Sequence, residues 1–141
     1  MTASSKKDIV LARGHKIHCI KHIPLVLEDR FQELKRIKDV KNVLDRLGLK
    51  EEIERTKRKK IRSGKGTSRG RRYKKKKGPL IIVKEDKGIS HGARNLPGVE
   101  VVELKNLDVE KLAPGAKPGR LCIWTQSALS ELEKLKIAGE A

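Results

Sequence analysis

The chain has very few aromatic residues. Among its 141 residues, only Phe31, Tyr73 and Trp124 carry an aromatic ring of the Phe, Tyr or Trp type. Proteins that read unpaired bases of RNA or DNA stack those bases on several aromatic side chains. This chain cannot build such a platform, so any nucleic acid that it binds should be recognised through phosphates and shape.

Cysteines and long apolar segments are also scarce. Cys19 and Cys122 are far apart in the sequence and form no CxxC motif. Both lie in apolar surroundings, so we expect buried, reduced thiols of an intracellular protein. No apolar run approaches the length of a membrane span, and the N-terminus lacks the apolar core of a signal peptide. The sequence therefore predicts a cytoplasmic protein with no membrane partner.

The motifs of nucleotide-binding and metal-dependent enzymes are missing as well. The glycine-rich run 63–70 has neither the GxGxxG nor the GxxxxGK[ST] spacing, and no strand is expected before it. His15, His18, Cys19 and His22 stand within eight residues, but their spacing matches no paired zinc knuckle. We expect surface histidines beside a strand, and no metal, cofactor, small-molecule substrate or catalytic residue.

Positive charge is abundant, and it is concentrated in one segment. Residues 55–77 contain 14 Lys or Arg and no acidic residue, whereas the whole chain has 35 basic and 18 acidic residues and a net charge of +17. Gly64, Gly66 and Gly70 disfavour a helix or a packed strand there, and burying so much unpaired charge is costly. The sequence predicts a flexible basic arm, residues 55–78, inserted between a helix and the second core strand.

A nucleic acid is the partner that the chemistry of the arm favours. Arginine can bind a phosphate through two hydrogen bonds, and the arm lacks the apolar face of a membrane-binding segment. A solvated linker or a nuclear localisation signal is the alternative. The candidate RNA-binding residues of the arm are Arg58, Lys60, Arg62, Lys65, Arg69, Arg71, Arg72, Tyr73, Lys74, Lys75 and Lys76.

Three further candidates lie in loops beside expected strands. Arg94 and Asn95 precede a Pro-Gly pair, and Arg120 follows another, positions that project polar groups from a rigid scaffold. Because the immediate neighbours of Arg120 are uncharged, we expect it to grip an RNA phosphate. The alternative is that Asn95 makes a turn bond and both arginines pair with acidic residues such as Glu100 or Glu103. For Arg94 and Asn95 the sequence favours neither reading.

Short apolar strands alternate with helices along the chain. This alternation is typical of an α/β domain with a parallel sheet. Carboxylates end the first two strands, at 28–29 and 85–86, and we expect them to cap the helices that follow rather than to form a catalytic pair. The expected strands cover residues 23–29, 80–83, 99–104 and 121–124, and the expected helices cover 3–13, 31–47, 49–60, 89–96, 107–112 and a last segment that starts at Thr125 or Ser127.

Several segments together resemble one known family. They are KIRSGKGTSRGRRYK at 60–74, GPLIIV at 78–83, ARNLPGV at 93–99, LAPGAKPGR at 112–120 and WTQSA at 124–128. They resemble the universal large-subunit ribosomal protein "L four" in its archaeal and eukaryotic branch, and the resemblance covers residues 5–137. Family members begin with a further strand and an extension that reaches the peptide exit tunnel, so this chain is similar to their globular C-terminal part.

The resemblance implies a fold and a function. The fold is a single three-layer α/β domain, residues 1–141, around a four-stranded, mostly parallel sheet. The function is a structural, non-catalytic one in the large ribosomal subunit, with large-subunit rRNA and neighbouring large-subunit proteins as partners. The alternatives are a nucleic-acid-associated α/β enzyme and a protein-interaction domain.

Overall fold

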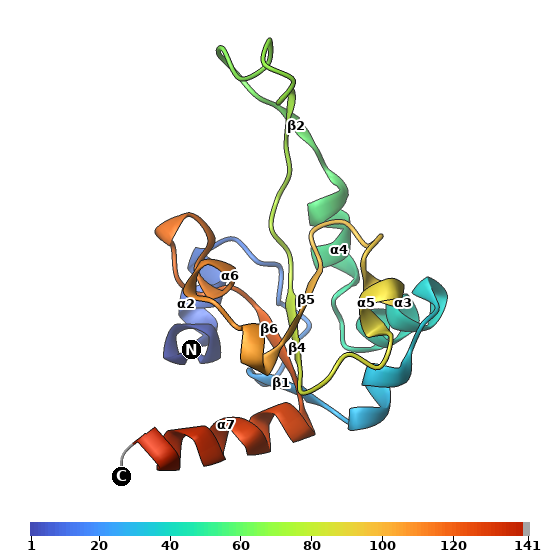
Figure 1. Cartoon of the computed structure of the whole chain (residues 1–141). Coiled ribbons are helices and arrows are strands. Elements are labelled where there is room, and N and C mark those ends of the chain that lie inside the picture. The colour runs from blue at the N-terminus through green and yellow to red at the C-terminus, as the bar shows by residue number, and fades with distance from the viewer. Residues whose placement is uncertain (140–141) are drawn as a thin grey trace.

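A four-stranded parallel sheet lies at the centre of the computed structural model, which describes residues 1–139 and the side chains of residues 1–134 (Figure 1). The strand order is β1-β6-β4-β5, and each neighbouring pair runs parallel. This confirms the predicted α/β class and parallel sheet. The last two residues of the predicted domain, 140 and 141, lie outside the described residues. The strands are β1 (Leu25–Leu27), β4 (Leu80–Val83), β5 (Glu100–Glu103) and β6 (Cys122–Thr125).

Helices connect the strands as the sequence pattern predicted, although their bounds differ. The α-helices are α1 (Thr2–Ser5), α2 (Lys7–Ala12), α3 (Ile37–Arg46), α4 (Lys50–Lys57), α5 (Ile89–Ala93), α6 (Val109–Leu112) and α7 (Gln126–Gly139). Three 3-10 helices, η1 (Asp29–Glu33), η2 (Leu104–Asn106) and η3 (Pro114–Ala116), complete the connections. Within the described residues, no helix combines the length and the apolar character that crossing a bilayer requires.

One predicted helix, 31–47, is broken into η1 and α3. Leu34 and Arg36, which lie between the two helices, have an extended backbone conformation. Helix α5 packs closely against the break, because a Cβ added at Gly92 would lie 2.9 Å from the carbonyl oxygen of Leu34. The periodicity of apolar residues continues through the break, which is why the sequence suggested one helix.

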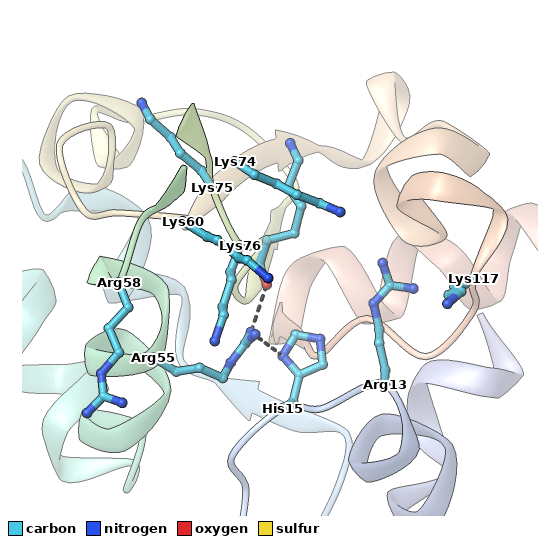
Figure 2. Close-up of a pocket in the computed structure, with 10 residues that line it drawn as sticks. Arg13, His15, Arg55, Arg58, Lys60, Lys74, Lys75, Lys76 and Lys117 are labelled. Atoms are coloured by element: carbon cyan, nitrogen blue, oxygen red, sulfur yellow. Dashed lines mark hydrogen bonds between the residues drawn. The ribbon is translucent and has the colours of Figure 1, made fainter. Parts of the chain in front are cut away.

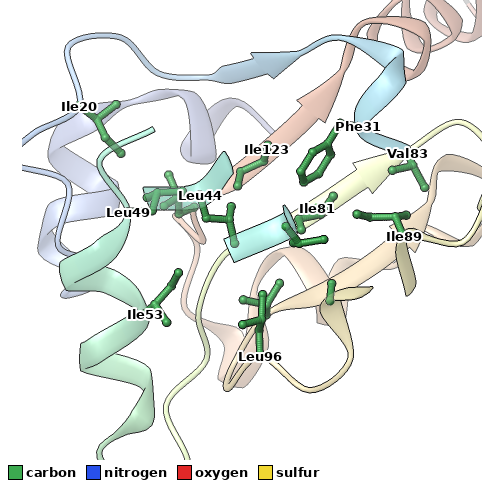
Figure 3. Packing of buried hydrophobic residues seen from close by; sticks show 14 of the residues in the cluster. Ile20, Phe31, Leu44, Leu49, Ile53, Ile81, Val83, Ile89, Leu96 and Ile123 are labelled. Atoms are coloured by element: carbon green, nitrogen blue, oxygen red, sulfur yellow. The ribbon is translucent and has the colours of Figure 1, made fainter. Parts of the chain in front are cut away.

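Both faces of the sheet carry buried apolar side chains. Alternate residues of a strand point to opposite faces, so Ile81 and Ile123 join the cluster with α3, α4 and α5 in Figure 3, whereas Ile82 and Trp124 pack with the side of the sheet that α7 covers. The layers are therefore helix, sheet and helix. The continuous apolar run at the first expected strand is typical of a strand covered on both faces. That expectation is wrong for β1, which is an edge strand whose Val26 is 46% exposed.

The carboxylates after β1 and β4 act as helix caps. The Oδ1 atom of Asp86 accepts hydrogen bonds from the backbone N–H groups of Gly88 (2.9 Å) and Ser90 (3.3 Å) at the start of α5, as predicted. Asp29 instead accepts a 2.9 Å bond from the N–H of Ser127 in α7, rather than capping the helix that follows it in the chain. Hydrogen bonds from Ser127 are also the main reason that the pKa of Asp29 is lowered.

The prediction for the two cysteines is half right. Cys122 is buried in β6, and burial raises the pKa of its thiol. Cys19 is exposed, in the loop before β1. Both are free thiols.

Candidate nucleic-acid interface

The basic segment rises from the domain as a long hairpin between α4 and β4 (Figure 1). Its strands β2 (Lys60–Ile61) and β3 (Tyr73–Lys74) pair antiparallel. A 2.8 Å bond from the N–H of Arg62 to the carbonyl of Arg72 extends the pairing toward the tip. These strands were not predicted, because the three glycines of the segment disfavour strand formation. The ladder forms beside the glycines and leaves them in the tip.

The hairpin tip folds back on itself through polar contacts. Gly64 and Gly70 have φ values of +85° and +73°, a left-handed conformation that side chains disfavour. The N–H of Arg71 donates to the carbonyl of Gly66 at 2.9 Å, and the hydroxyl of Thr67 donates to the carbonyl of Arg62. These bonds define a hairpin in place of an unstructured arm, while the predicted flexibility of the segment stays a prediction.

Every candidate residue of the hairpin is exposed. Arg58, Lys60, Arg62, Lys65, Arg69, Arg71, Arg72, Tyr73, Lys74, Lys75 and Lys76 all present their side chains to solvent. Tyr73 is 50% exposed, and the Nζ of Lys59 and the Cζ of Arg72 lie 5.9 and 5.8 Å from the centroid of its ring. The hairpin therefore exposes many cationic side chains and one aromatic side chain.

A buried carboxylate anchors the foot of the hairpin. Glu52 in α4 is fully buried and accepts hydrogen bonds from the Nδ1 of His15 (2.7 Å), the N–H of Lys16 (2.9 Å) and the Nε of Arg55 (2.8 Å). The Nη2 of Arg55 donates both to Glu52 (2.6 Å) and to the carbonyl of Lys77 (2.8 Å), where the hairpin returns to the domain. Glu52 therefore fixes Arg55, and Arg55 holds the returning chain.

The charges of this cluster are defined by its hydrogen bonds. Burial raises the pKa of Glu52, but the bonds from Arg55, His15 and the N–H of Lys16 outweigh that effect and lower it to about 2. The Nε2 of His15 accepts the N–H of Leu121 at 3.4 Å, so the imidazole proton lies on Nδ1 and is donated to Glu52. The expectation of surface histidines is wrong for His15, which is buried.

Glu52 and His15 were not predicted as parts of this interface. The signal for Glu52 was present, because it lies beside Leu49, Ile53 and Thr56 on the buried face of α4. A carboxylate on an apolar helix face needs a partner, and Arg55 is three residues away. Nothing local pointed to His15, which is 37 residues from Glu52.

A cationic cleft of about 380 Å³ opens where the hairpin meets the domain (Figure 2). Figure 2 shows Arg55 and Arg58 on one side of this cleft, Arg13 and Lys117 on the other, and the hairpin lysines above. We call it the foot cleft. Its lining residues are Arg13, His15, Arg55, Arg58, Lys60, Lys74, Lys75, Lys76, Lys77 and Lys117. Arg13 and Lys117 were not predicted as binding residues.

A second cleft, of about 410 Å³, brings Arg94 and Asn95 to the hairpin. Both are exposed and line this cleft together with Lys59 and the hairpin lysines 75–77. Among the described side chains, neither makes a hydrogen bond or an ion pair, so the alternative of a turn bond and local acidic partners finds no support. Contact of these two residues with RNA stays a prediction.

Sequence comparison with known proteins gives the family. The sequence profile of the "Ribosomal protein L4/L1 family" matches residues 3–135 of the 141. The chain belongs to this family. The family is the one that the sequence segments resembled, and it is a family of ribosomal proteins rather than of enzymes.

Individual relatives agree with the family assignment, and each bears the name "Large ribosomal subunit protein uL4". The Methanosphaera stadtmanae protein is 44% identical over 136 residues, and the Methanopyrus kandleri protein is 47% identical over 135. The Candida albicans protein is 41% identical over 136 residues. These alignments cover 95–96% of this chain, 52% of each archaeal relative and 38% of the Candida protein. The chain spans about half the length of the archaeal relatives that it matches.

Arg120 does not lie where a member of this interface would have to be. Its side chain is 0% exposed. The Nε donates to the carbonyl of Gly78 (2.9 Å), and Nη1 donates to Glu100 (2.7 Å) and to the carbonyl of Lys111 (2.8 Å). The expected phosphate contact is therefore incompatible with this geometry, and the pairing with Glu100 that was the alternative is present. Tertiary structure brings Glu100 to Arg120 from a neighbouring strand, so uncharged sequence neighbours were no guide.

The described residues contain no group of three or more His, Cys, Asp or Glu side chains that could hold a metal ion. His15 is committed to Glu52, and Cys19 is exposed in the following loop. What the interface offers chemically is positive charge and hydrogen-bond donors at a protruding surface.

Proposed function

We propose that this chain is a structural component of the large ribosomal subunit and that residues 55–78 form an arm that binds large-subunit rRNA. The observation that carries the proposal is the protruding hairpin, whose exposed cations have no acidic residue among them. The names of the relatives support the ribosomal part of the proposal.

The physical basis of binding is phosphate neutralisation. Lysine and arginine that contact phosphates release condensed counterions, which gives strong attraction with little dependence on sequence. Arginines at 62, 69, 71 and 72 add planar forks that fit phosphate oxygens. A narrow hairpin fits a groove or a junction of folded RNA, where several phosphates face inward.

The hydrogen bonds of Glu52 and Arg55 fix the base of the hairpin to the domain. Because Arg55 joins the buried Glu52 to the carbonyl of Lys77, the outgoing helix and the returning chain are held together. A hairpin fixed at its base loses less conformational entropy on binding than a free chain of equal length. Arg94 and Asn95 line the second cleft with the hairpin lysines, and in this proposal they extend the RNA contact onto the domain.

We infer a ribosomal, cytoplasmic location and contacts with neighbouring large-subunit proteins. The edge strand β1, whose Val26 is 46% exposed, offers a surface for such neighbours. The chemistry of the proposed role requires neither a cofactor nor a small-molecule substrate.

Cosedimentation tests the proposal. A tagged copy of the chain, expressed in its source cells, should remain with large subunits after a high-salt wash. A matched copy in which Arg62, Arg69, Arg71 and Arg72 are replaced by Gln should be lost from the subunits. Recovery of the parent chain only in the soluble fraction would overturn the proposal.

A further inference from the structure

We propose that the foot cleft is a second phosphate-binding site, built by the globular domain as well as by the hairpin, and that Arg13 and Lys117 hold RNA backbone phosphates there. This inference rests on the proposed rRNA-binding function and adds residues that lie far from the basic segment in the sequence. Four segments of the chain form the site, and they meet at the end of the sheet where the parallel strands begin.

Distant segments contribute cations to the same cleft. Arg13 follows α2, Arg55 lies in α4, the hairpin lysines lie on the returning strand, and Lys117 lies in the loop before β6. Figure 2 shows their side chains arranged around one open space. Cations that surround one open space repel one another, so the arrangement becomes more favourable when an anion lies between them.

The nearby carboxylates are already occupied. Glu52 is bound by His15 and Arg55, and Glu100 is bound by Lys77 and Arg120. Among the described side chains, no carboxylate lies within 4.0 Å of the charged groups of Arg13 or Lys117. The excess positive charge of the cleft is therefore left for an anion from outside the protein.

Arg13 is held in place rather than free to move away. Its Nη1 and Nη2 donate to the carbonyls of Pro118 (3.2 Å) and Pro114 (2.9 Å), which fixes the guanidinium against the Pro-Gly loop. Partial burial, and then the charges of Arg120 and Arg55, lower the pKa of Arg13. Folding thus keeps like charges together at a cost, and a bound phosphate would relieve that repulsion.

The shape of the cleft suits a polymer backbone. The cleft continues onto the hairpin through Lys74 and Lys76. An RNA strand that follows the hairpin can therefore continue into the foot cleft, which favours backbone phosphates over an isolated phosphate ion.

Salt-dependent binding to deproteinised large-subunit rRNA of Methanosphaera stadtmanae tests the inference. The test variant is Lys117→Gln, since the structure shows no internal hydrogen bond of this exposed side chain that would be lost. The matched control is Lys105→Gln, an exposed lysine in η2 at the opposite edge of the sheet. Arg13→Gln is a second test variant, and thermal melting checks its fold. Inorganic phosphate, added as a competitor, separates a free ion from an RNA strand.

Lys117→Gln should lower the slope of log K against log salt by about 1, as for one lost phosphate contact, while Lys105→Gln leaves it at the parent value. If Lys117→Gln and folded Arg13→Gln keep the parent slope while the hairpin arginine variant loses affinity, the inference is overturned and the proposed function stands. If the hairpin variant also binds like the parent, both are overturned. One more result would overturn the inference. In it, millimolar inorganic phosphate binds at Lys117, but Lys117→Gln leaves the affinity for rRNA unchanged.

Discussion

Replacing the buried Glu52 by glutamine should destabilise the domain by about 3 kcal/mol at pH 7. The pKa of Glu52 falls from 4.5 to about 2 on folding. At about 1.4 kcal/mol for each pKa unit, ionised Glu52 contributes roughly 3 kcal/mol to the free energy of unfolding. Glutamine keeps the shape of the side chain but removes the charge, and its amide places a donor where His15 and Arg55 also donate.

The pH dependence identifies the cause of that loss. Because the folded-state pKa is depressed, the contribution is fully present above about pH 4.5, the unfolded value, and is lost as the pH falls toward 2. Urea denaturation of the parent and of Glu52→Gln from pH 7 down to pH 3 should show a stability difference that shrinks below pH 4.5. The control, Glu54→Gln, changes an exposed residue of the same helix and should shift stability by less than about 0.5 kcal/mol.

Two results would refute this reasoning. One is a stability difference between parent and Glu52→Gln that stays constant from pH 7 to pH 3. The other is a cost no larger than that of Glu54→Gln. Either would mean that the ionised carboxylate is not what stabilises the foot of the hairpin.

Three further predictions concern the hairpin, the buried arginine and a helix cap. Deleting Lys60–Lys76 should abolish tight rRNA binding yet leave a single cooperative melt, since the segment buries no apolar residue; a lost transition would make the hairpin part of the core. Arg120→Ala should cost about 3 kcal/mol, because it empties a fully buried position and removes the donor to two carbonyls, while Glu100 keeps only its ion pair with Lys77; a parent-like urea midpoint would contradict this. Asp29→Ala should cost about 1 kcal/mol through its bond to α7, measured against Asp39→Ala, an exposed position in α3.

Much of this protein follows from local sequence pattern. The apolar run 80–83 is a strand buried at every residue, as its β-branched composition predicts. The cations at 58–76 remain exposed, because this stretch contains no acidic residue that could pair with them in a buried position. The scarcity of aromatic residues is a property of composition alone. These features depend on neighbours in the chain, which the sequence displays directly.

The partners of individual polar residues were decided by tertiary structure. Arg120 meets Glu100 across 20 residues, His15 meets Glu52 across 37, Asp29 meets Ser127 across 98, and Arg13 meets Pro114 across 101. Parallel strands joined by crossovers bring such positions to a common edge of the sheet. Once there, a buried charge must take whichever partner lies within hydrogen-bond distance, and no periodicity of the sequence identifies that partner. The same physics places Arg13 and Lys117 beside the hairpin, in a cleft that exists only in the folded chain.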